Sequence, residues 1–147
     1  MNSSVNNPGI EPILEARNLS KHFSSGGTLT KHVVKAVEGA SFKLYPGRVT
    51  ALVGESGSGK STIARTLIRL YEPTSGDILY KGRSILKDSS RKALLSYRSE
   101  VQMIFQDPFS SLNPIHSVRY ILERPLHIHG KAKRGQELKQ VYDLLDR

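Results

Sequence analysis

The sequence contains no cysteine and no long apolar run, and each absence excludes a class of chemistry. Without thiols, the 147 residues cannot form disulfides, thiolate metal sites or a thiol nucleophile, which agrees with a reducing cytosol. No stretch approaches the roughly 20 apolar residues that a membrane-spanning helix needs. The polar start of the sequence also lacks the apolar segment of a signal peptide. We therefore expect any role at a membrane to depend on a partner.

Charge is the second compositional signal, because the chain carries a formal net charge of +9. Such an excess is typical of proteins that bind nucleic acid or an anionic membrane surface. Here the basic residues are scattered, and the densest cluster is only Lys131, Lys133 and Arg134. We therefore favour a solvated surface together with a site that handles phosphates, and we expect no direct contact with nucleic acid.

Apolar periodicity and turn residues predict an α/β domain that follows a flexible tail over 1–12. Strands are predicted at 13–23, 33–37, 40–44, 49–53, 78–80 and 101–105. Of these, Val49–Val53 and Val101–Phe105 are mostly apolar, as expected of strands that are buried on both faces. Helical spacing predicts helices at 61–70, 90–97, 117–123 and 136–145, with Pro125 ending the third.

A glycine-rich segment follows the first of the two buried strands. It meets the phosphate-loop pattern G-x-x-x-x-G-K-S/T at every fixed position, through Gly54, Glu55, Ser56, Gly57, Ser58, Gly59, Lys60 and Ser61. Glycines permit positive φ, so successive N–H groups can point into one concavity, at which the following helix directs its positive end. We expect Lys60, a candidate catalytic residue, to reach the β- and γ-phosphates, Ser61 to ligate Mg²⁺ and Thr62 to add a hydroxyl. A plain glycine–serine helix cap would explain the glycines but not the lysine and serine after a buried strand.

The second buried strand runs into Gln106 at the entrance of a loop. A phosphate loop followed by a strand that ends in glutamine resembles the Q-loop arrangement of ABC ATPases. A glutamine suits this place because its carbonyl can bind Mg²⁺ or orient the attacking water, and because a loop can move with a partner. Gln106 is therefore a candidate catalytic and metal-binding residue, although by itself it would be interpreted as a polar residue at a strand end.

Three segments resemble those of a narrower group, the ATP-binding subunits of dipeptide, oligopeptide and nickel importers. They are the phosphate loop, the run Val34–Val37 leading into Phe42–Leu44, and Phe109–Pro114 directly after Gln106-Asp107-Pro108. The resemblance covers the sequence from about Leu14 onward. The resemblance implies a P-loop NTPase fold of the ABC type that includes an N-terminal antiparallel β subdomain. It places the ATP-binding core over 13–106, and the Q-loop with the start of a helical subdomain over 107–147. It also implies ATP and Mg²⁺ as cofactors.

The same resemblance assigns two further sites and the partners. Phe23 matches the aromatic residue on which the family stacks adenine, which a π-face can recognise without hydrogen bonds; the alternative is a core aromatic at a strand end. Phe109–Pro114 matches the surface that receives the coupling helix of the transmembrane permease subunits; the alternative is a rigid proline-bounded loop. The resemblance also implies a second ATP-binding subunit, which pairs with this one in a head-to-tail dimer. It implies a peripheral location on the cytoplasmic face of the membrane.

Several family motifs are missing from this sequence. It contains no LSGGQ-type signature, no apolar run ending in Asp-Glu that would supply the Walker B carboxylates, and no switch histidine, since His116, His127 and His129 stand in the wrong context. We interpret the sequence as the front part of an importer ATPase, truncated before these motifs. Two alternatives stay open: a nucleotide-binding module that does not hydrolyse ATP, and an ABC ATPase that acts on nucleic acid or the ribosome, for which the charge is the support.

Overall fold

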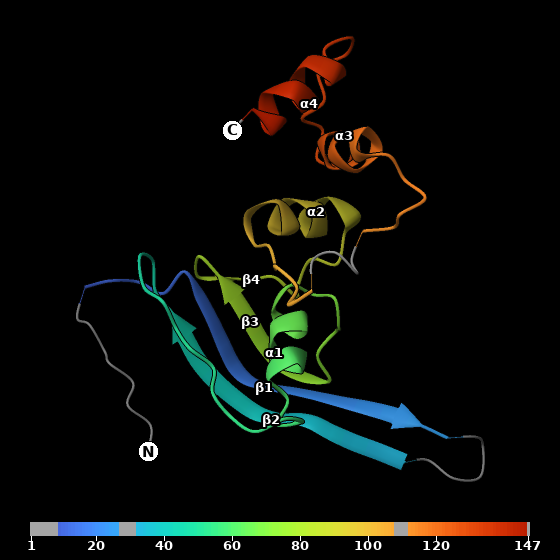
Figure 1. The fold of residues 1–147 in the computed structure, drawn as a ribbon. Coiled ribbons are helices and arrows are strands. Elements are labelled where there is room, and N and C mark those ends of the chain that lie inside the picture. Colours follow the sequence, from blue (N-terminus) through green and yellow to red (C-terminus); the bar gives the residue numbers. More distant parts are fainter. Residues whose placement is uncertain (1–8, 27–31, 108–111, 147) are drawn as a thin grey trace. The chain divides into compact units, whose positions relative to one another are not determined.

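The computed structural model describes residues 9–26, 32–107 and 112–146, and it divides the chain into two compact units, 1–94 and 95–147. The first unit holds a four-stranded sheet and helix α1 (Lys60–Leu67), and the second holds helices α3 (Val118–Ile128) and α4 (Glu137–Leu145) (Figure 1). Helix α2 (Arg91–Glu100) crosses the boundary between the units. Within the described ranges, no helix combines the length and the apolar character that a membrane span requires.

The sheet is antiparallel, with strand order β2-β1-β3-β4, which confirms the predicted antiparallel β subdomain (Figure 1). Its strands are β1 (Leu14–Ser25), β2 (His32–Leu44), β3 (Ser75–Tyr80) and β4 (Arg83–Ser84). The two short strands predicted at 33–37 and 40–44 are one strand, because a bulge and not a break separates them. The bulge includes Gly39, whose φ is +62° and whose N–H donates to the buried Ser20 Oγ at 2.9 Å.

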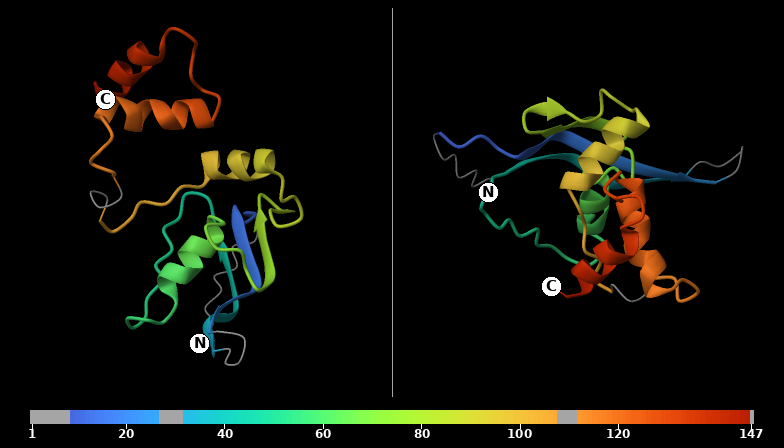
Figure 2. Two further views of the ribbon diagram at one scale, coloured as in Figure 1. Left: turned by 90° about the vertical axis from the view of Figure 1, so that its right-hand side faces the viewer. Right: turned by 90° about the horizontal axis from the view of Figure 1, so that it is seen from above.

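The core of the first unit forms where β1 and β3 face α1. Leu14, Ala16, Leu19 and Ile78 are buried in one cluster, against which Leu67 of α1 packs. Leu14 and Ala16 share a face because they are two residues apart in β1. Helix α1 therefore lies against one face of the sheet (Figure 2), and the phosphate-loop segment before it is attached to this core.

Helix α1 ends three residues earlier than predicted. The N–H of Leu70 donates to the carbonyl of Arg65 at 2.8 Å and that of Arg69 to the carbonyl of Thr66 at 2.9 Å, which is the Schellman pattern. Arg69 takes the left-handed conformation of this motif, with φ of +55°. Its buried guanidinium donates to the Ile85 carbonyl at 2.8 Å and pairs with the Glu72 carboxylate at 3.0 Å. These bonds fix the end of α1 to the segment beyond β4.

The prediction of two strands buried on both faces is wrong for this structure. Residues 49–53 and 101–105 form no strand, and Val49, Val53 and Ile104 are 99%, 89% and 91% exposed. A strand requires ladder hydrogen bonds to a neighbour, and within the described residues the sheet consists of β1 to β4 only. The apolar pattern therefore identified segments that are suited to burial, but it could not predict whether neighbouring strands would pair with them.

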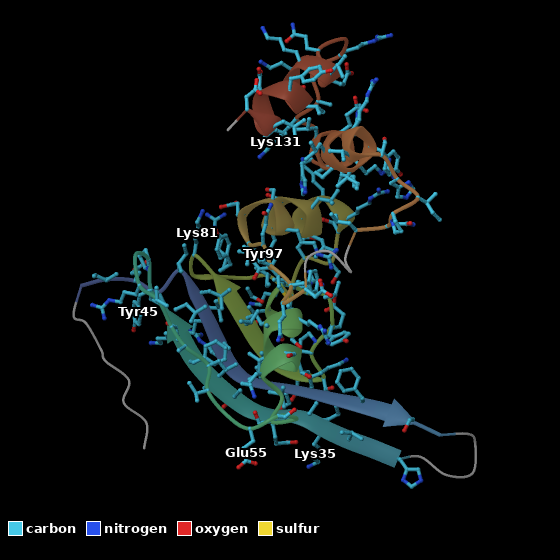
Figure 3. The ribbon with its side chains drawn as sticks, in the orientation of Figure 1. Lys35, Tyr45, Glu55, Lys81, Tyr97 and Lys131 are labelled. Atoms are coloured by element: carbon cyan, nitrogen blue, oxygen red, sulfur yellow. The ribbon has the colours of Figure 1, made fainter. Side chains whose placement is uncertain are left out.

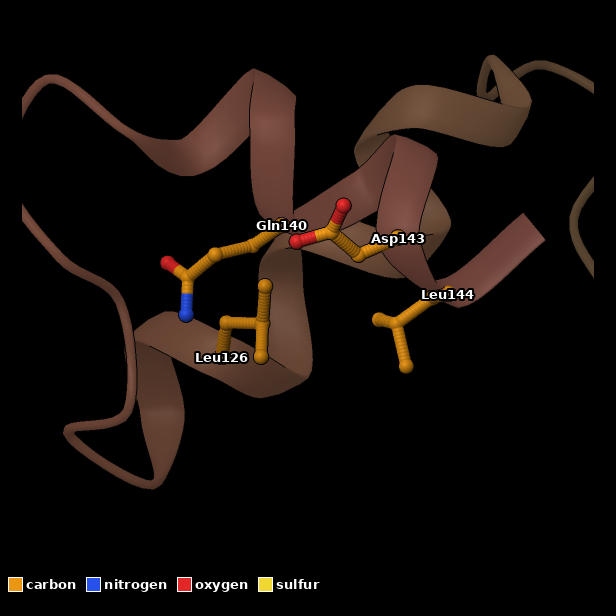
Figure 4. Close-up of a pocket in the computed structure, with 4 residues that line it drawn as sticks. All are labelled: Leu126, Gln140, Asp143 and Leu144. Atoms are coloured by element: carbon orange, nitrogen blue, oxygen red, sulfur yellow. The ribbon is translucent and has the colours of Figure 1, made fainter. Parts of the chain in front are cut away.

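The second unit is a pair of packed helices. Ser117 caps the start of helix α3, because its Oγ accepts a hydrogen bond from the N–H of Tyr120 at 3.2 Å. Val141 of α4 is buried. Helix α3 continues through Pro125, so the prediction that this proline ends the helix is wrong. Directly after this proline, Leu126 lines a pocket together with Gln140, Asp143 and Leu144 of α4 (Figure 4).

Candidate functional site

The phosphate loop, Gly54–Ser61, is a tight backbone structure that relies on its glycines. Gly57 and Gly59 adopt φ of +82° and +89°, values that side chains with a β-carbon rarely take. The N–H of Ser58 donates to the carbonyl of Glu55 at 3.2 Å, which closes a turn inside the loop. Glu55 marks the position of this loop in Figure 3.

Gly59 is the point at which the loop touches the sheet. A β-carbon at this position would collide with the carbonyl oxygen of Ala36 and would lie 3.5 Å from a methyl group of Val37, both in β2. The last glycine of the motif therefore has two functions: it takes a left-handed backbone conformation, and it lets the start of α1 approach the backbone of β2.

Lys60 folds back over the loop that precedes it. Its Nζ donates to the carbonyl oxygens of Gly54 at 2.7 Å and of Glu55 at 2.5 Å, and to Ser58 Oγ at 3.2 Å. These bonds hold the ammonium group at the concave side of its own loop. An ammonium held there supplies the positive charge that a phosphate ligand requires.

The start of helix α1 adds backbone donors to this charge. Its N-cap is Gly59, no side chain caps it, and no acidic residue lies in its first turn. The N–H groups of the first turn therefore remain donors for an anion, in line with the positive end of the helix dipole. Ser61 is exposed and Thr62 half-buried in this turn. The donor set suits phosphate groups.

The expected Mg²⁺ site is consistent with the same arrangement. Within the described ranges, no group of three or more His, Cys, Asp or Glu side chains could enclose a metal ion. Mg²⁺ bound to a nucleotide does not need such a group, because phosphate oxygens and waters provide most of its ligands. An exposed serine hydroxyl such as that of Ser61 is sufficient as one protein ligand.

Phe23 lies near the end of β1, where it pairs with Val34 of β2. The loop meets β2 two to three residues further along, at Ala36 and Val37, a separation of about 7–10 Å at roughly 3.3 Å per residue. This spacing is compatible with a nucleotide that reaches from the loop to the ring. The ring of Phe23 also packs edge-on against Tyr71, with centroids 5.2 Å apart.

Sequence reasoning did not identify Tyr71 or Lys21 as neighbours of Phe23. The ammonium of Lys21 lies 5.1 Å from the Phe23 centroid and 5.9 Å from the Tyr71 centroid. Tyr71 stands in the turn after α1, a place where the sequence signals only a helix end. The i, i+2 spacing of Lys21 and Phe23 along a strand was a usable signal for a shared face.

The carboxylate of Glu38 in β2 contacts side chains of the two strands beside the loop, His22 of β1 and Lys35 of β2. Its Oε2 lies 2.7 Å from His22 Nε2 and 3.5 Å from Lys35 Nζ. The hydrogen bond to His22, with a smaller contribution from Lys35, holds the pKa of Glu38 below its ordinary value. Glu38 therefore stays ionised and paired at neutral pH.

Gln106 and the segment after it belong to the second unit, whereas the phosphate loop belongs to the first. Gln106 is exposed at a bend that follows 102–105, and its catalytic and metal-binding roles stay predictions. Of the predicted permease-binding segment Phe109–Pro114, residues 109–111 lie outside the described residues. In the described remainder, Asn113 Oδ1 accepts the N–H of Ile115 at 3.0 Å, and the side chains of Leu112 and Ile115 are 48% and 86% exposed.

Comparison with known proteins gives a consistent result. The sequence profile described as ABC transporter matches residues 37–147. The oligopeptide transport ATP-binding protein AppF of Bacillus subtilis is 46% identical over 140 residues, which cover 93% of this chain and 43% of the relative. The glutathione import ATP-binding protein GsiA of Salmonella typhimurium is 45% identical over 140 residues, covering 93% of this chain and 22% of the relative. The chain thus spans less than half the length of these curated relatives.

Solved structures show the same fold. The protein cbiO1 of Clostridium perfringens, part of the ABC transporter complex cbiONQ, superposes with a TM-score of 0.65 at 28% identity, over 92% of this chain and 49% of that chain. A dimeric ATP-binding cassette in a post-hydrolysis state with ADP and Pi gives a TM-score of 0.71 at 21% identity, over 90% of this chain and 56% of that chain. The predicted P-loop fold of the ABC type is confirmed by these neighbours.

Proposed function

Because the chain belongs to the ABC transporter family, we propose that it binds MgATP in the ATP-binding subunit of an importer for peptides or related solutes. Lys60, the loop N–H groups and the first turn of α1 bind the phosphates, and Ser61 ligates Mg²⁺. The observation that carries the proposal is the position of Lys60 Nζ, within 2.7 Å of two carbonyls of its own loop at an uncapped helix start. The transport relatives support the solute class.

The remaining site residues complete the proposal. Phe23 stacks the adenine at the edge of β1, and Gln106 binds Mg²⁺ or orients the attacking water in the assembled transporter. The exposed side chain of Leu112, and that of Ile115 directly after the segment, support a role for Phe109–Pro114 in contact with permease subunits. A second ATP-binding subunit pairs head to tail with this one, and the assembly lies on the cytoplasmic face of a membrane.

The phosphate site is tested by titration with a fluorescent ATP analogue in the presence of Mg²⁺. Lys60→Ala is expected to abolish binding, because it removes the ammonium group that lies over the loop. Lys92→Ala is the matched control: it removes the same charge from an exposed lysine of α2 and is expected to bind like the unaltered chain. Equal binding by the Lys60→Ala variant and the unaltered chain would contradict the proposal.

Binding and hydrolysis are expected to separate in this chain. The sequence contains a phosphate loop but no signature motif and no Walker B carboxylates. The attacking water therefore lacks a general base, and the phosphate loop of a second subunit lacks a signature motif to close on it. Purified chain is therefore expected to show negligible steady-state phosphate release with MgATP. Robust turnover that disappears in the Lys60→Ala variant would show that this chain hydrolyses ATP without those motifs.

A further inference from the structure

Phe23 belongs to a small cluster that joins β1 to the turn after α1. Its ring meets that of Tyr71 at 85° between planes, with 5.2 Å between centroids, which is the edge-to-face geometry that aromatic pairs prefer. The ammonium of Lys21 lies within 6 Å of both ring centroids and donates to the carbonyl of Glu72 at 2.8 Å. The two rings and the lysine therefore restrain one another.

The cluster is connected to the phosphate loop through both of its ends. Tyr71 donates its N–H to the carbonyl of Arg65 in α1 at 3.2 Å, so the Tyr71 ring is carried by the helix whose first turn faces the phosphates. Lys21 pairs across the ladder with Val37, the residue whose methyl group lies beside Gly59. The ring of Phe23 is thus held relative to the loop by two independent connections.

The neighbouring strand β2 gives the Phe23 ring less support than the turn after α1 does. Val34, its partner in the ladder, is 59% exposed, and the neighbouring Val33 is 50% exposed. A half-buried aromatic ring at a strand end would change rotamer readily without a side chain packed against it. The contacts with Tyr71 and Lys21 are those that oppose such a change.

We propose that Tyr71 and Lys21 are positioning residues for the nucleobase: they hold the Phe23 ring in the orientation in which a purine stacks on it. This inference rests on the proposed nucleotide site and adds residues that do not themselves contact the phosphates. It makes base recognition depend on side chains from β1 and from the turn after α1. The recognised group is the aromatic face of the base, so ATP and GTP are equivalent ligands here.

The test separates the base from the phosphates by comparing ATP with inorganic tripolyphosphate, both measured calorimetrically with Mg²⁺. Tyr71→Leu is expected to weaken ATP binding by about three- to ten-fold, the range of one edge-to-face contact, and to leave tripolyphosphate binding unchanged. Lys60→Ala, by contrast, is expected to abolish the binding of both ATP and tripolyphosphate. A Tyr71→Leu variant that loses both ligands equally would overturn the inference, because that result indicates a fold defect.

Two further variants test whether the effect depends on the aromatic ring and on its position in the fold. Tyr71→Phe keeps the ring and is expected to bind ATP like the unaltered chain. Tyr80→Leu makes the same substitution as Tyr71→Leu at a tyrosine with a lysine ammonium 5.0 Å from its centroid, but Tyr80 pairs with Leu14 at the opposite end of β1. It is expected to leave the ratio of ATP to tripolyphosphate affinity unchanged, and an equal fall in that ratio for both variants would overturn the inference.

A double-mutant cycle shows whether Tyr71 acts through Phe23. In a Phe23→Ala background, Tyr71→Leu is expected to change ATP affinity no further, and additive losses would overturn the inference. Lys21→Met, which keeps an unbranched apolar stem, is expected to weaken ATP binding by about two- to five-fold through loss of the cation–π contact. If the unaltered chain binds neither ligand, the nucleotide site itself is wrong; if it binds both and Tyr71→Leu has no effect, only the positioning role is wrong.

Discussion

At the scale of single residues, Gly59 determines whether the phosphate loop can meet the sheet. Gly59→Ala is expected to lower both the unfolding midpoint and ATP affinity, because the new β-carbon collides with the Ala36 carbonyl as well as straining a φ of +89°. Left-handed strain by itself costs about 1–2 kcal/mol. Thermal unfolding and ATP titration measure both effects.

Gly82 provides the matched control for Gly59. Its φ is +74°, and a β-carbon built there meets no atom within 4 Å. Gly82→Ala is therefore expected to show the conformational strain without the collision, and to leave ATP affinity unchanged. If the two alanine variants lose the same stability and the same affinity, contact with β2 is not what requires a glycine at position 59.

Phe23 is the residue at which stacking and core packing make different predictions. If the ring stacks a purine, Phe23→Ala should weaken ATP and GTP binding alike, by about 1–3 kcal/mol for one stacking contact. The loss is similar for the two nucleotides because either base offers a π-face. Competition titrations with ATP and GTP measure it, and an unchanged affinity for both would identify Phe23 as a core residue.

At the scale of secondary-structure elements, α3 includes a proline at a position where a helix normally needs an N–H. Pro125 is exposed and cannot donate to the carbonyl of Ile121. Pro125→Ala is expected to raise the free energy of unfolding by about 1–3 kcal/mol, since alanine restores the bond and favours the helix. Arg124→Ala, at the exposed neighbouring position, should change it by less than about 0.5 kcal/mol. Chemical denaturation followed by circular dichroism compares them; a less stable Pro125→Ala variant would show that the proline ring is required.

At the scale of the whole molecule, we expect the exposed apolar segment 49–53 to promote self-association of the chain. Val49 and Val53 are almost fully exposed and Leu52 is 51% exposed, although such side chains contribute about 1.5–3 kcal/mol each when buried. We expect the 147-residue chain to self-associate and to unfold over a broad range of temperature.

The double substitution Val49→Ser and Val53→Ser should reduce this association. Light scattering and calorimetry test this; a sharp transition and monomeric elution for 1–147 would contradict it.

The sequence predicted those features that depend on local chemistry. Spacing of apolar residues placed α1, α2, α4 and β3 within a few residues of their observed bounds, and the phosphate-loop pattern located a loop with the expected positive φ values at Gly57 and Gly59. Such features are determined by residues close together in the chain, because a glycine's conformational freedom and a helix's first turn do not require distant partners.

The tertiary structure decided what depends on residues far apart in the chain. Whether Val49–Val53 becomes a strand depends on neighbours that no local pattern supplies. Helix α3 likewise continues past Pro125, where the local pattern predicts an end. The contact of Gly59 with Ala36 and the packing of Phe23 against Tyr71 join segments 23 and 48 residues apart. These groups became neighbours only when the sheet and the segment around α1 packed together, because such contacts arise from the whole fold and not from any local sequence preference.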